Sequence, residues 1–84
     1  MEINQAVKNK ILKAQKNEIT EHIIYKRLSA IPKEIKNKKI LEKISMQEIS
    51  HYNFWKKYSL ADTQPNRFKV SFYCHISKFL GLNF

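Results

Sequence analysis

The sequence has 84 residues and allows one small domain, with a core near the lower limit for independent stability. One glycine and two prolines leave little turn chemistry, which excludes a fold of many short strands and predicts an all-α protein. The single cysteine, Cys74, excludes an internal disulfide and favours a reducing, cytoplasmic compartment. Neither a secretory signal nor a run of 18 apolar residues is visible.

The net charge of +9 favours partners with negative charge, such as nucleic acid or an anionic membrane surface. The lysines up to residue 57, however, are scattered and interleaved with glutamates, which is typical of solvated helix surfaces. Nucleic acid is therefore not the partner that we expect. A basic binding module stays open as an alternative, because Arg67, Lys69 and Lys78 accompany aromatic residues near the C-terminus.

The first helix is predicted over residues 3–30, which contain neither glycine nor proline. One side of it carries a heptad stripe, in which acidic residues occupy the centre where apolar residues are expected. The members of this first stripe are Val7, Ile11, Ala14, Glu18, Glu21, Tyr25 and Leu28. Pro32 then ends the helix, and so short a break predicts an antiparallel neighbour.

The second helix is predicted over residues 33–58, and its apolar stripe also has ionisable residues at its centre. The members of this second stripe are Leu41, Ile44, Glu48, His51, Trp55 and Tyr58. We interpret Trp55 and Tyr58 as core aromatics. At about 1.5 Å of rise per residue, Glu18 and the pair of Glu48 and His51 all lie roughly 20–30 Å from the turn. The two ionisable centres should therefore be neighbours.

A polar connection over residues 59–65 leads to a third helix over 66–80. Apolar residues share one side of this helix, and they need a surface to cover: the hairpin, another subunit or a membrane interface. These residues are Phe68, Phe72, Ile76, Phe79 and Leu80. Cys74 has no partner residue for metal binding or nucleophilic chemistry and is interpreted as a small apolar residue.

Glu48 and His51 are three residues apart, so a helix places them on the same side. Burial of an ionised carboxylate without a partner costs several kcal/mol. A divalent metal would compensate this cost, and carboxylates with a neutral imidazole suit iron, manganese or zinc. We therefore predict Glu18, Glu48 and His51 as metal ligands. The alternative is a hydrogen-bonded Glu–His pair or a polar layer that fixes helix register.

Other residues near this centre have less defined roles. Glu21 is one turn beyond Glu18 and is interpreted as a hydrogen-bond acceptor for a ligand imidazole or as an ion-pair partner. Tyr25 is suited either to hydrogen-bond a ligand carboxylate or to pack its ring in the core. His22 is predicted at the surface, and His75 is not expected to be a ligand.

These features resemble the first half of the rubrerythrin-like branch of the ferritin-like superfamily, in which a Glu is followed by a Glu-x-x-His motif. The chain is most similar to the prokaryotic ferritin-like domain that precedes membrane iron transporters of the vacuolar iron transporter type. The segments that carry this resemblance are 17–22, 51–58, 65–70 and 79–82. The resemblance implies a di-iron site and association with a membrane iron transporter at the cytoplasmic face of the membrane.

The sequence departs from the family in one respect. The family supplies a second Glu and a second Glu-x-x-His, whereas this chain has no glutamate after Glu48 and only Asp62 as a later acid. We expect the hairpin to be half of a four-helix bundle that a second chain completes, with two irons per dimer. Ferrous oxidation would require that dimer. A truncated fragment and a metal-free oligomerisation segment are the alternatives.

Overall fold

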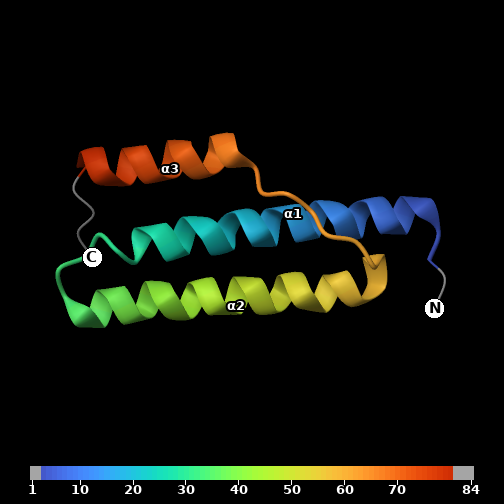
Figure 1. The fold of residues 1–84 in the computed structure, drawn as a ribbon, viewed down its shortest axis with the longest axis horizontal. Coiled ribbons are helices and arrows are strands. Elements are labelled where there is room, and N and C mark those ends of the chain that lie inside the picture. Colours follow the sequence, from blue (N-terminus) through green and yellow to red (C-terminus); the bar gives the residue numbers. More distant parts are fainter. Residues whose placement is uncertain (1–2, 81–84) are drawn as a thin grey trace.

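The protein is an all-α chain of three helices in the computed structural model, which describes residues 3–80 and the side chains of residues 3–78. The helices are α1 (Gln5–Leu28), α2 (Ile35–Ser59) and α3 (Arg67–Leu80). The described residues contain no strand. The predicted all-α class and the long helical hairpin are confirmed (Figure 1).

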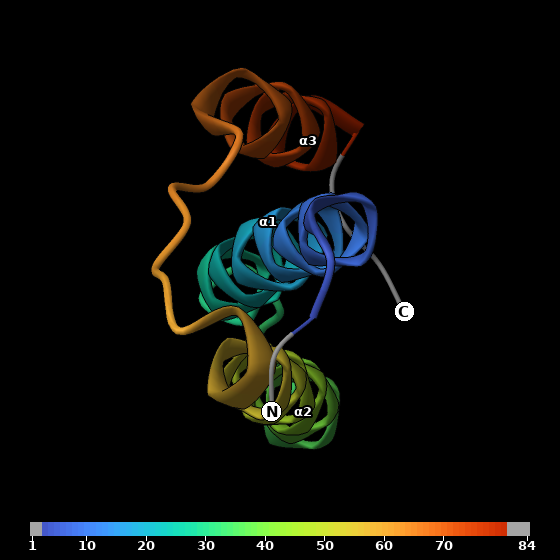
Figure 2. The same cartoon turned by 90° about the vertical axis from the view of Figure 1, so that its right-hand side faces the viewer.

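Helix α1 lies between the other two helices. Helix α2 packs antiparallel on one side of α1, and α3 runs parallel to α1 on the opposite side (Figures 1 and 2). Within the described part of the chain, α2 and α3 do not contact each other. The three helices therefore form a single flat layer, with principal extents of 47 × 24 × 15 Å. In the described part of the chain no further helix covers either broad face, and the connection between α2 and α3 crosses one of them over α1 (Figure 1).

The helix ends lie within two residues of the predicted ones. Helix α1 begins after Asn4 because the Asn4 side chain accepts a hydrogen bond of 2.8 Å from the backbone N–H of Val7. Helix α2 begins at Ile35, later than predicted, since the chain after Pro32 stays non-helical up to Glu34. It ends at Ser59, because the next residue, Leu60, adopts the left-handed conformation with a φ of 56°.

An apolar core holds α1 to both neighbours near the turn of the hairpin. Ile24 and Leu28 of α1 cluster with Leu41 of α2 and with Val70 and Cys74 of α3. Ile23, Tyr25 and Ile31 pack against this cluster. The prediction that Cys74 is a small apolar core residue agrees with its burial here.

Polar contacts replace apolar ones toward the other end of the hairpin. Gln15 is fully buried, donates a hydrogen bond of 2.7 Å to the carbonyl oxygen of Ala61 and accepts one from the Ser59 hydroxyl. The Thr20 hydroxyl accepts a hydrogen bond of 2.9 Å from the backbone N–H of Asn66. These bonds tie the connection between α2 and α3 to α1, which sets where α3 begins.

The start of the same connection is also fixed to α2. The Tyr52 hydroxyl donates to Asp62 at 3.0 Å and accepts from the backbone N–H of Thr63 at 3.1 Å. The ammonium group of Lys56 forms an ion pair of 2.6 Å with Asp62. Asp62, the one acidic residue after Glu48, thus has a structural partner, and it does not join the acidic residues at the centre of the hairpin.

None of the described helices combines the length and apolar character that crossing a membrane demands.

Replacement of Gln15 with alanine should lower the free energy of unfolding by about 1–3 kcal/mol, because it removes one hydrogen bond to the Ala61 carbonyl oxygen and one from the buried Ser59 hydroxyl. Urea unfolding followed by circular dichroism measures the change. Gln5→Ala is the matched control, since Gln5 is exposed and its hydrogen bond to Asn9 lies at the surface. Equal losses from the two variants would show that the buried polar cluster does not stabilise the fold.

Candidate metal centre

The three predicted ligands lie together at the middle of the hairpin. Glu18 comes from α1, and Glu48 and His51 come from consecutive turns of α2. One ligand atom from each residue lies within 4.8 Å of those of the other two. The Nδ1 atom of His51 is 3.4 Å from a carboxylate oxygen of Glu18 and 3.7 Å from one of Glu48.

The two carboxylates are well covered, whereas the imidazole is not. The side chains of Glu18 and Glu48 are 22% and 14% exposed, and that of His51 is 57% exposed. The Oε2 atom of Glu18 is buried and has no hydrogen-bond partner among the described residues, although His51 lies within ion-pair distance. Buried polar atoms are rarely left unsatisfied, so this oxygen marks a position where a bound group would be stabilised.

Glu21 adds a third carboxylate to the cluster. A hydrogen bond with Glu48, helped by partial burial, raises the pKa of Glu21 above its ordinary value, while the nearby positive charge of Lys69 acts against this shift. Burial raises the pKa of Glu48, and its hydrogen bond with Glu18 adds to that effect. Glu21 therefore brings a third carboxylate close to Glu18 and Glu48, and a divalent cation relieves such a concentration of negative charge.

Tyr25 lies beside the cluster but forms no hydrogen bond to a carboxylate among the residues described. Its ring packs on the apolar core and lines a groove of about 240 Å³ between α1 and α3. The groove is lined by Glu21, Ile24, Tyr25, Leu28, Lys69 and Tyr73. Of the two roles predicted for Tyr25, ring packing is the one that the structure supports.

The prediction for His22 is wrong. His22 was expected at the surface, but it is half-buried and faces α2, where its Nδ1 atom lies 2.7 Å from the carbonyl oxygen of Ser45. The Ser45 hydroxyl in turn donates to the carbonyl oxygen of His22 at 3.0 Å. The sequence signal for this contact is Ser45, a small polar residue of α2 at the level of His22.

His75 is exposed on α3, with its Nδ1 atom 2.9 Å from the carbonyl oxygen of Ser71. It is not among the described residues that come together at the centre of the hairpin.

The cluster opens onto one broad face of the helix layer. In an antiparallel pair, the contacts of Glu18 with His51 and of Glu21 with Glu48 place both predicted stripes on the same side. The end members of these stripes, Val7 and Tyr58, are exposed, and Trp55 is half-buried. The prediction that Tyr58 is a core aromatic is therefore not met within one chain.

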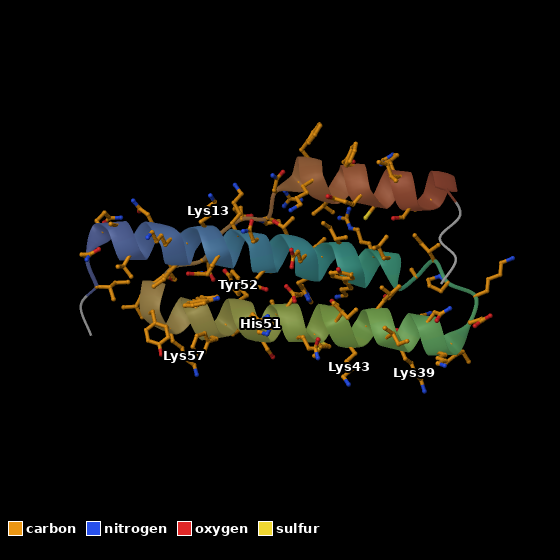
Figure 3. The ribbon with its side chains drawn as sticks, turned by 180° about the vertical axis from the view of Figure 1, so that it is seen from behind. Lys13, Lys39, Lys43, His51, Tyr52 and Lys57 are labelled. Carbon is orange, nitrogen blue, oxygen red and sulfur yellow. The ribbon has the colours of Figure 1, made fainter. Side chains whose placement is uncertain are left out.

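The donor set suits a hard or borderline divalent cation, but one chain gives an incomplete coordination shell. Two carboxylates and an imidazole supply fewer ligands than iron or manganese takes, and the exposed side of His51 leaves the remainder open. His51 stands on α2 next to Tyr52, whose ring is directed toward α1 (Figure 3). The arrangement can hold a cation from one side only.

Comparison with known proteins gave no match to any protein-family model, curated protein or solved structure. The resemblance to ferritin-like proteins stays a prediction from the sequence motifs.

Replacement of Glu21 with glutamine should make the metal-free chain more stable at pH 7. Because folding raises the pKa of Glu21, the protonated Glu21 carboxyl contributes its full stability to the fold at pH values below the pKa of the unfolded chain. This stability is lost as the pH rises through the raised pKa of the folded protein. The stability gained by Glu21→Gln should therefore shrink as the pH is lowered.

Urea unfolding in a chelator at several pH values tests this dependence. Glu42→Gln, at an exposed position on α2, is the control and should show no such trend. A Glu21→Gln variant that is less stable than the wild type at pH 7 would contradict the raised pKa of Glu21.

Proposed function

We propose that the chain is a ferritin-like metal-binding protein that binds iron at a carboxylate and histidine site completed by a second copy. The observation that carries the proposal is the convergence of Glu18, Glu48 and His51, with one buried oxygen of Glu18 left without a hydrogen bond. Glu48 would bridge two metal ions, while Glu18 and His51 would each bind one. Manganese and zinc are accommodated by the same donors.

The need for a second copy follows from the open side of the cluster. Two chains packed across the broad face about a two-fold axis would place the same three ligands on both sides of the metal pair. The pair would then have four glutamates and two histidines, the set typical of carboxylate-bridged di-iron sites. When bound, such a metal pair would supply redox chemistry toward oxygen or peroxide.

The residues around the cluster also suit this interface. The broad face carries exposed or half-buried apolar side chains at both ends of the hairpin, among them Val7, Ile44, Trp55 and Tyr58. Lys39, Lys43 and Lys57 lie instead along the edge of α2 that faces away from α1 (Figure 3). The face proposed for association is therefore apolar with an ionisable centre, and these lysines do not oppose its burial.

Glu21 would act beside the ligands. Its hydrogen bond to Glu48 orients the carboxylate proposed as the bridge, and the proximity of Lys69 balances part of its charge. A residue that holds a ligand carboxylate in place in this way commonly changes metal affinity by about 10–100-fold when it is replaced.

Anaerobic addition of Fe(II) to the purified chain should give two bound irons per dimer, measured by metal analysis and by mass in solution. Glu48→Ala should abolish this binding, because it removes the proposed bridge. Glu42→Ala is the matched control and should bind as much iron as the wild type, since Glu42 is an exposed glutamate of the same helix. A monomer that binds no iron would contradict the proposal, and undiminished binding by Glu48→Ala would show that the ligands are assigned wrongly.

Tyr58→Lys should shift the chain from dimer to monomer and weaken iron binding at the same time, because it places a charge within the proposed interface. Met46→Lys is the matched control, since Met46 is an exposed apolar residue of α2 outside the predicted stripe. Sedimentation velocity with and without iron measures both effects. Iron binding that is unchanged in a monomeric Tyr58→Lys variant would show that one chain suffices for the site.

A further inference from the structure

The outer side of α3 carries three large apolar residues that nothing in the described structure covers. Phe68, Phe72 and Ile76 are 82%, 52% and 40% exposed. Their spacing of four residues puts them in one row along the helix. A groove lined by these three residues together with Ser71 and His75 runs along the row. Isolated exposed apolar residues are ordinary, but a continuous aromatic row of this kind marks an interaction surface.

The row formed by Phe68, Phe72 and Ile76, called the outer row below, lies on the side of α3 opposite to the side that packs on α1. Val70 and Cys74 pack into the core against α1, so the row must point away from the hairpin. Helix α3 forms one edge of the flat layer, and α2 forms the other (Figure 2). The hairpin therefore cannot cover the row, and a dimer formed across the broad face, where the metal cluster opens, would leave it at the edge.

The charge around the outer row has a single sign. The sequence contains no acidic residue after Asp62, whereas Arg67, Lys69 and Lys78 all belong to α3. Lys13 of α1 lies on the side of α1 that carries α3 (Figure 3). Asp62 itself is paired with Lys56. A helix that has an exposed apolar row, and that carries only cations as charged residues, complements a surface that is apolar below and negatively charged above.

We propose that α3 docks on an anionic membrane surface, with Phe68, Phe72 and Ile76 inserted among the lipid headgroups and Arg67, Lys69 and Lys78 in contact with lipid phosphates. A flat bilayer can reach α3 without meeting α2, because α1 separates the two helices. A second copy fits this row less well. From Phe68 to Ile76 the row is about 12 Å long, which is short for an interface that needs roughly 800 Å² per partner.

Flotation of the chain with vesicles tests the proposal. The wild type should bind phosphatidylcholine vesicles that contain phosphatidylglycerol and should not bind vesicles of phosphatidylcholine alone. Phe68→Ala with Phe72→Ala should lower partitioning by about tenfold or more, because it removes the inserted rings. The control is Phe54→Ala, at a phenylalanine of α2 that is also about half exposed. Equal binding by wild type and the Phe68/Phe72 variant would overturn the proposal.

A charge-matched pair of variants separates docking by α3 from general attraction of a basic protein to anionic lipid. Arg67, Lys69 and Lys78 changed to glutamine should weaken vesicle binding strongly. Lys39, Lys43 and Lys57 changed to glutamine remove the same charge from the far edge of α2 and should weaken it much less (Figure 3). Equal weakening by the two triple variants would overturn the proposal. So would self-association, or oligonucleotide binding, that depends on Phe68 and Phe72 in the absence of vesicle binding.

The depth of insertion gives a readout that does not depend on affinity. The chain has a single tryptophan, Trp55 on α2, so Phe68→Trp in a Trp55→Phe background reports on α3 alone. Its emission should shift to the blue on anionic vesicles and be quenched by lipids brominated on their acyl chains. An emission unchanged by bound vesicles would overturn insertion of the outer row. None of these variants alters Glu18, Glu48 or His51. Phe68 and Phe72 lie on the side of α3 that faces away from the hairpin, so the result for the Phe68/Phe72 variant is independent of the proposed metal site.

Discussion

The whole fold depends on α1, because α2 and α3 both pack on this helix and do not touch each other. One of its sides must therefore satisfy an antiparallel partner and the other a parallel one. It does so with apolar contacts near the turn, through Ile24 and Leu28, and with polar contacts farther along, through Gln15 and Thr20. A helix used on two opposite sides leaves its remaining surface for the broad faces of the layer, and Glu18 and Glu21 stand at the edge of that surface.

Part of this arrangement follows from the sequence by simple geometry. The single break at Pro32 fixes an antiparallel hairpin, and helical rise then brings Glu18 to the level of Glu48 and His51, as the structure shows. The position of the stripes relative to the hairpin did not follow in the same way. A heptad stripe predicts the side of a helix that faces the centre of a bundle of several helices. In this hairpin of two helices, the closest contacts are made beside the stripes, by Gln15, His22 and Ser45.

Helix α3 illustrates a second limit. It has apolar residues on opposite sides, so periodicity alone cannot say whether Val70 and Cys74 or Phe68 and Phe72 face the hairpin. Contacts outside α3 determine which of its two apolar sides faces the hairpin. The hydrogen bond from the backbone of Asn66 to Thr20, together with the contacts of Asp62 with Tyr52 and Lys56, fixes how the chain enters α3. Such contacts join residues that are far apart in the sequence, and no local pattern encodes them.

The burial of Cys74 has a consequence for the chemistry of this thiol. Its side chain is buried in the core between α1 and α3, the less extensive of the two helix pairings that α1 makes. Because the Cys74 side chain is largely buried, local opening of α3 from α1 exposes the sulfur further, and the rate of alkylation then depends on both the population of the open form and the reactivity of the thiol. Labelling of the single cysteine therefore reports on the opening of the third helix.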